Sequence, residues 1–137
     1  MAETVASPPQ DRDLASIAEA RALARRARHA ANVLGELSQA QIDAIVAAVA
    51  DTATAHAEVL ARLAVDETGF GVYEDKIQKN LFASQKVYSF IKPMKTVGVI
   101  ARHEDRRVVE IAEPFGVVAA IVPSTNPTST AIYKILI

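Results

Sequence analysis

Few residues of this chain have the types and the spacing that chemistry requires. The sequence contains no cysteine, so a thiol nucleophile, a disulfide or a zinc-thiolate site cannot be built from these residues. The three histidines, His29, His56 and His103, are far apart in the sequence and lack the spacing of metal ligands. We expect each of them to be a surface or packing residue, and no metal site is predicted.

The remaining polar candidates follow a long apolar run. Residues Gly116 to Val122 are continuously apolar, and the loop Pro123-Ser124-Thr125-Asn126-Pro127 comes next. Such a run is typical of a strand buried on both faces of a parallel sheet, and ligands bind beyond the carboxyl ends of such strands. An asparagine before a proline is by itself a turn signal, so a structural interpretation of Asn126 stays open beside a functional one.

Two other clusters favour structural interpretations. The charged residues Glu67, Glu74, Asp75 and Lys76 are typical of a solvated first helical turn, in which acids lie favourably near the helix amino terminus. The pair Gly69-x-Gly71 is too short for a dinucleotide fingerprint, and it follows a predicted helix where that motif needs a strand. We interpret it as a helix end and a turn.

Length and charge limit the class of protein. With 137 residues, 50% of them apolar, the chain has the balance of one ordinary globular domain. Its net charge of -1 lacks the basic character of proteins that bind nucleic acid or anionic membranes, so neither partner is predicted. Residues 1–10 are interpreted as a flexible lead without a secretory signal, and the apolar runs are too short to span a membrane. We therefore predict a cytoplasmic protein.

Helical periodicity dominates the first two thirds of the chain. A basic, amphipathic helix is predicted over residues 13–34, with core packing as its favoured role. Ser38 and Gln41 have the spacing of a capping box, so a second helix is expected from Ser38, with a break near Thr52 or Thr54 before a third. A fourth helix fits residues 73–91, with Ile77 and Leu81 on its apolar side.

The pattern then changes from helix to strand. Residues 96–102 and 106–113 are predicted to form a β-hairpin with partial cover on both faces. After the run 116–122, a further helix is expected from Thr128 to Ile137, with Thr128 or Ser129 near its cap. That helix ends on apolar residues without a C-cap, from which we predict a truncated chain.

Three stretches together resemble the CoA-acylating aldehyde dehydrogenases, which include the acetaldehyde and sulfoacetaldehyde enzymes and the amino-terminal half of the aldehyde-alcohol dehydrogenases. The stretches are Asp66-Glu67-Thr68-Gly69-Phe70-Gly71 with Glu74-Asp75-Lys76-Ile77 and Lys79-Asn80, then Ile111-Ala112-Glu113-Pro114-Phe115-Gly116-Val117-Val118, then Pro123-Ser124-Thr125-Asn126-Pro127-Thr128-Ser129-Thr130-Ala131-Ile132. The third is the most specific to the acylating branch. The resemblance runs from about Leu37 to the end.

The resemblance implies an incomplete α/β fold of the aldehyde dehydrogenase type. Residues 11–95 would be the helical part of a nucleotide-binding domain, and residues 96–113 a β-hairpin of the extension used in oligomer contacts. Residues 114–137 would supply the first strand, loop and helix of the nucleotide-binding parallel sheet. A homo-oligomer is implied for the full-length protein.

The resemblance also implies a reaction, in which NAD or NADP oxidises an aldehyde to a cysteine thioester and the acyl group then passes to coenzyme A to give an acyl-CoA. The cysteine would lie outside this chain, which alone is expected to be inactive. Asn126 is implied as the donor to the oxyanion, because its amide can donate to the oxygen that becomes negative. Val122, Pro123, Ser124 and Thr125 would border the cofactor.

One departure from the family pattern leaves alternatives open. Ordinary aldehyde dehydrogenases have P-x-N-x-P in this loop, whereas here Asn126 is displaced by one residue and Thr125 occupies the usual position. Thr125 or backbone N–H groups are therefore alternative oxyanion donors. A non-acylating aldehyde dehydrogenase and a non-catalytic helical scaffold are the alternative functions.

Overall fold

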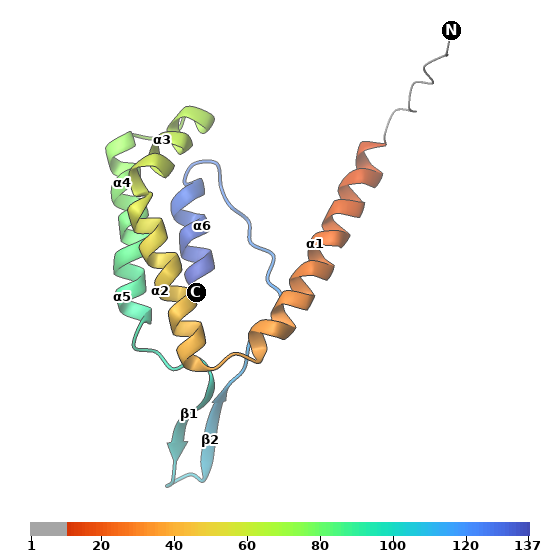
Figure 1. Cartoon of the computed structure of the whole chain (residues 1–137), viewed down its shortest axis with the longest axis vertical. Helices are drawn as coiled ribbons and strands as arrows, with labels where there is room; N and C mark the ends of the chain where they lie inside the picture. The colour runs from red at the N-terminus through yellow and green to blue at the C-terminus, as the bar shows by residue number, and fades with distance from the viewer. Residues whose placement is uncertain (1–10) are drawn as a thin grey trace.

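The computed structural model describes residues 11–137, which form a helical bundle and a separate β-hairpin (Figure 1). The interpretation of residues 1–10 as a flexible lead lies outside the described residues. The elements in chain order are α1 (Arg12–Gly35), α2 (Gln39–Ala55), α3 (Ala57–Thr68), α4 (Tyr73–Leu81), the π-helical turn η1 (Phe82–Val87), α5 (Tyr88–Ile91), β1 (Gly98–His103), β2 (Val108–Ala112) and α6 (Pro127–Leu136).

Local signals set most helix ends as predicted. The capping box is confirmed, because the Ser38 side chain accepts from the Gln41 backbone while the Gln41 side chain accepts from the Ser38 backbone. Gly69 ends α3 in a left-handed conformation, with φ 68°. The break between α2 and α3 falls at His56, slightly later than Thr52 or Thr54, and bends the chain by 65°.

The bundle core is built mainly from small side chains. Helix α6, a late segment of the chain, packs against α2 and against the continuous rod of α4, η1 and α5, and α2 also contacts that rod (Figure 1). Alanine at the contacts lets helices approach closely, because interaxial distance depends on the side chains between them. The buried core cluster comprises Ala50, Ala53, Ala83, Ile132 and Leu136.

Helix α1 does not join this core. Asp11 caps it by accepting from the backbone N–H groups of Asp13 and Leu14. None of its residues is buried, and it diverges from the bundle in Figure 1. The predicted core-packing role is therefore wrong for this chain, because no other described element covers its apolar side.

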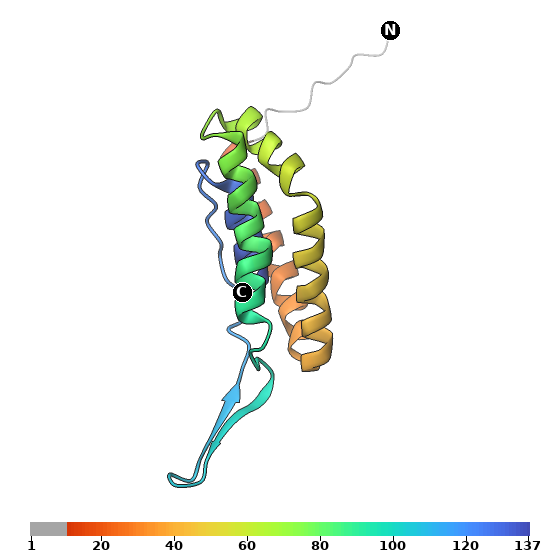
Figure 2. The same cartoon turned by 90° about the vertical axis from the view of Figure 1, so that its left-hand side faces the viewer.

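The β-hairpin projects beyond one end of the bundle in both views (Figures 1 and 2). Its strands are antiparallel, with Val99 opposite Ile111 and a bulge between Val99 and Ala101. The two strands are shorter than predicted, and the expected partial cover of both faces is wrong: most of their residues are exposed. Gln39 of α2 accepts from the backbone N–H groups of Thr96 and Val97 and so ties the hairpin to the bundle.

The predicted strand from Gly116 to Val122 is not formed in the structure. Within residues 11–137 the only sheet is the two-stranded hairpin, so the apolar run has no neighbouring strand with which to exchange backbone hydrogen bonds. The run is also exposed instead of buried, with Ile121 at 85% of its full accessibility. The segment runs without helix or strand from the hairpin to the start of α6, and we call residues 113–123 the open segment (Figure 1).

No single helix in residues 11–137 is long and apolar enough to cross a membrane. Helices α2 and α3 taken together reach that length and composition, but the bend at His56 separates them.

Candidate active-site loop

The loop of predicted site residues ends in a tight turn. The backbone N–H of Asn126 donates to the Pro123 carbonyl over 3.3 Å, and the N–H of Thr130 donates to the Asn126 carbonyl over 3.2 Å. Helix α6 therefore begins at Pro127, slightly earlier than the predicted cap at Thr128 or Ser129. Proline suits this first position because its missing N–H would have no partner there.

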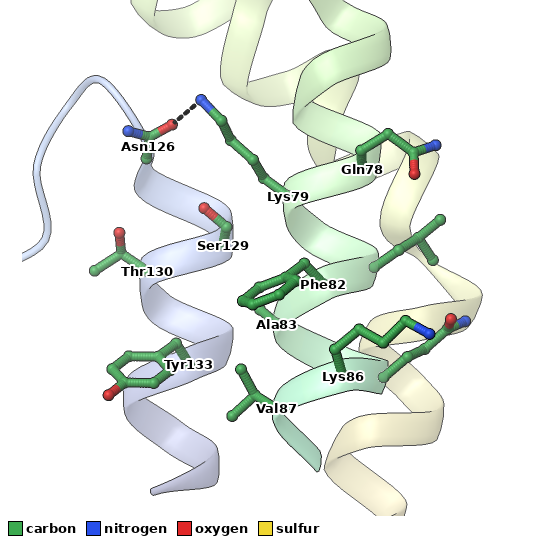
Figure 3. Close-up of a pocket in the computed structure, with 12 residues that line it drawn as sticks. Gln78, Lys79, Phe82, Ala83, Lys86, Val87, Asn126, Ser129, Thr130 and Tyr133 are labelled. Atoms are coloured by element: carbon green, nitrogen blue, oxygen red, sulfur yellow. Dashed lines mark hydrogen bonds between the residues drawn. The ribbon is translucent and has the colours of Figure 1, made fainter. Parts of the chain in front are cut away.

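Asn126 occupies the N-cap position of α6, but its side chain makes no capping hydrogen bond. Instead, its Oδ1 accepts from Lys79 Nζ over 3.0 Å (Figure 3). Lys79 lies on α4, so the contact joins two elements that are 47 residues apart in the sequence. The side chain of Asn126 is thus held by a neighbouring helix and is not used in local capping.

Lys76 holds the residue just before Asn126. Its Nζ donates to the Thr125 carbonyl over 2.8 Å, and the side chain is only 4% exposed. The predicted solvated position of Lys76 is wrong, whereas Glu74 and Asp75 are exposed as predicted. Gly71 leaves the room that Lys76 needs, because a Cβ atom at Gly71 would lie 3.1 Å from Lys76 Cε.

A buried polar network lies one turn further along α4. The fully buried Asn80 donates through Nδ2 to the Ala57 carbonyl over 2.9 Å, and its Oδ1 accepts from the Thr128 hydroxyl over 2.8 Å. Asn80 thereby joins α3, α4 and the first turn of α6. Ser84 donates to the Asn80 carbonyl and accepts from Thr54, which extends the network to α2. The start of α6, and with it the loop, is fixed against three helices.

The residues predicted to border a cofactor lie on the outer side of the same loop. Val122, Pro123, Ser124 and Thr125 are exposed, and they lead into the amino terminus of α6. Hydroxyl and backbone groups there could donate to or accept from a dinucleotide, so the donor set is compatible with NAD or NADP. The structure brings all four next to Asn126 in one loop.

Lys76, Lys79, Asn80 and Ser84 were missed by the sequence interpretation as residues that hold the loop. Positions 76, 80 and 84 follow one another at helical spacing, and all three are buried. The apolar residues Ile77 and Leu81 were expected to face inward, but both are only partly buried. The signal available in the sequence was the polar stripe at a spacing of four residues. It could not identify these residues, because an exposed polar helix face has the same spacing.

The chain is similar in sequence to known aldehyde dehydrogenases. The profile described as "Aldehyde dehydrogenase family" matches residues 4–137. The bifunctional aldehyde-alcohol dehydrogenase of Escherichia coli strain K12 is 43% identical over 122 residues, which are 89% of this chain and 14% of that protein. The acylating sulfoacetaldehyde dehydrogenase of Cupriavidus necator is 41% identical over 97% of this chain and 27% of its own length.

The solved structures give the same result for the fold. The crystal structure of an acetylating aldehyde dehydrogenase from Geobacillus thermoglucosidasius is similar with a TM-score of 0.90 and 53% identity, over 93% of this chain and 28% of that one. The chain thus spans between about a seventh and a little over a quarter of these relatives. The predicted resemblance and the incomplete α/β fold are confirmed. By its sequence profile and by its fold, the chain belongs to the aldehyde dehydrogenase family.

Proposed function

We propose that this chain is part of an enzyme that oxidises an aldehyde to an acyl-CoA with NAD or NADP. The overall reaction converts an aldehyde, coenzyme A and NAD(P)⁺ into an acyl-CoA, NAD(P)H and a proton. The observation that carries the proposal is the loop 123–127 in a chain similar to acylating dehydrogenases. In this loop Lys79 binds the side-chain oxygen of Asn126, and the Asn126 side chain makes no capping hydrogen bond to α6. The nucleophilic cysteine comes from outside these 137 residues.

In this proposal Asn126 donates through its amide nitrogen to the substrate oxygen. That oxygen becomes negative when a thiolate adds to the aldehyde carbon, and a preorganised donor stabilises the charge without reorganisation. Thr125 and the backbone N–H groups at the start of α6 are the alternative donors. The positive end of the α6 dipole, at the same place, favours the same charge.

Val122, Pro123, Ser124 and Thr125 border the cofactor in this proposal. A dinucleotide bound there would supply the hydride acceptor, and coenzyme A would take the acyl group. The residues of this chain supply the wall of the site, while the helical part 11–95 and residues 114–137 belong to the nucleotide-binding domain. The exposed hairpin 96–113 is proposed as part of a homo-oligomer contact.

The test of the proposed reaction is an assay of the full-length protein with a panel of short aldehydes. We expect NAD(P)H formation that depends on coenzyme A, with acyl-CoA as the product. Oxidation that proceeds equally well without coenzyme A and yields the free acid would instead place the protein in the non-acylating branch. The absence of any aldehyde oxidation would support a scaffold role.

The role of Asn126 is tested by Asn126→Ala in the full-length protein. We expect the acylation rate to fall by roughly a hundredfold, as loss of one oxyanion donor typically does. Thr125→Val removes the neighbouring hydroxyl and serves as the comparison. If Thr125→Val causes the large loss and Asn126→Ala leaves the rate unchanged, the donor is Thr125.

A further inference from the structure

We propose that Lys79 is a positioning residue for Asn126, which fixes the direction of its amide and strengthens its N–H donors. This inference rests on the proposed function. A lysine ammonium has three donors and no acceptor, so only the amide oxygen of Asn126 can face it. With Oδ1 bound to Lys79 over 3.0 Å, Nδ2 points away from α4 (Figure 3). An asparagine amide without this contact could rotate by half a turn, so that its oxygen, and not its nitrogen, would face the substrate.

The charge of Lys79 adds a second effect. A hydrogen bond from a cation to an amide oxygen draws electron density toward that oxygen and polarises the amide, and linked hydrogen bonds strengthen one another in this way. The Nδ2–H groups of Asn126 are therefore better donors than those of an unpaired asparagine. That gain is largest toward an acceptor that becomes negative during the reaction.

Lys76 supports the same arrangement from the backbone side. Lys76 and Lys79 lie three residues apart on α4, and they bind two consecutive residues of the loop, Thr125 through its carbonyl and Asn126 through its side chain. The buried Lys76 fixes where the loop runs, whereas Lys79 fixes which way one side chain faces. Of the two lysines, only Lys79 acts directly on the Asn126 amide that donates to the substrate.

A purely structural role for Lys79 makes a different prediction. Lys79 is exposed and its hydrogen bond lies at the surface, where a single such contact contributes little to stability. A structural role therefore leaves both the stability and the rate of a Lys79 variant nearly unchanged. A positioning role leaves the stability unchanged but lowers the rate.

The experiment uses the full-length protein and measures coenzyme A-dependent NAD(P)H formation together with thermal unfolding. Lys79→Met is expected to lower kcat by roughly tenfold, less than the loss of the donor itself, with little change in KM or Tm. Lys79→Arg restores a cationic donor and is expected to recover much of the rate. Lys86→Met, further along the same helical rod, is the charge-matched control and should leave kcat unchanged.

A double variant decides whether Lys79 acts through Asn126. In the Asn126→Ala background, Lys79→Met should cause no further loss, because there is no amide left to orient. An equal loss in both backgrounds would overturn the inference, as would an active enzyme that Asn126→Ala slows and Lys79→Met does not. If the full-length protein oxidises no aldehyde, the proposed function fails and this inference fails with it.

Discussion

The bundle of α2 to α6 and the segments around it both carry apolar residues, but these residues lie in opposite environments. In the bundle, small and branched apolar residues such as Ala50 and Ile132 are buried. Outside it, α1 has no buried residue, and the open segment 113–123 leaves Phe115 at 98% and Ile121 at 85% exposure. Apolar character alone therefore does not decide which residues of this chain form a core.

The difference lies in the neighbours that each segment finds. Helix α6 packs against α2, α3, α4 and η1, and Asn80 of α4 joins it to α3 through hydrogen bonds. The run 116–122 finds no such cover among the described residues. The residues that hold the loop at Asn126 belong to the part of the chain that packs against itself, so the geometry of the loop is set inside the bundle.

The difference between the bundle and the open segment is tested most strongly by an isoleucine-to-alanine substitution made in each of them. In the 137-residue chain, Ile132→Ala should lower the free energy of unfolding by about 3 kcal/mol, because it removes buried methyl groups and leaves a cavity. Ile121→Ala, in the open segment, should change it by less than about 0.5 kcal/mol. Urea unfolding followed by circular dichroism measures both. Equal losses would mean that the open segment is also packed in solution.

Asn80 gives the second test, on polar contacts. Asn80→Ala should lower the free energy of unfolding by about 2 kcal/mol, because the buried Ala57 carbonyl and Thr128 hydroxyl both lose a partner. Asn32→Ala, at an exposed position on α1, is the matched control and should change stability by less than about 0.5 kcal/mol. A neutral Asn80→Ala would show that the network is not needed to hold the bundle.

Local features were predictable because local rules determine them. The capping box at Ser38, the end of α3 at Gly69 and the helix over residues 73–91 depend on residues close in the sequence. The π-helical turn was not predicted, since apolar periodicity does not distinguish it from an α-helix. In the structure, the Ser84 hydroxyl within that turn bonds the Asn80 carbonyl.

The position of the loop was predictable from the sequence, but the residues that hold it were not. The motif around Asn126 identified the loop, whereas Lys76 and Lys79 reach it across separations of 49 and 47 residues. The sequence spacing of Lys76 and Lys79 on a charged helical turn does not show which of the two is buried. The prediction of a strand at 116–122 was wrong for a different reason. Its apolar pattern is typical of a strand buried on both faces of a parallel sheet, and residues 11–137 provide no neighbouring strand.

Two glycines provide the smallest test of the comparison. Gly71 and Gly116 both have positive φ, 82° and 90°, but a Cβ atom would approach Lys76 only at Gly71. Gly71→Ala should lower the free energy of unfolding by about 1 kcal/mol, whereas the open segment around Gly116 can relax and should lose less.

The same substitution should also reach the loop. Because a Cβ atom at position 71 would crowd the Lys76 side chain, which binds the Thr125 carbonyl, we expect the backbone amide of Asn126, which closes the turn onto Pro123, to exchange its hydrogen faster in Gly71→Ala. Gly116→Ala lies closer to that turn in the sequence but does not crowd Lys76, so exchange at Asn126 should stay unchanged. Faster exchange in Gly116→Ala and not in Gly71→Ala would show that the open segment, and not α4, holds the loop.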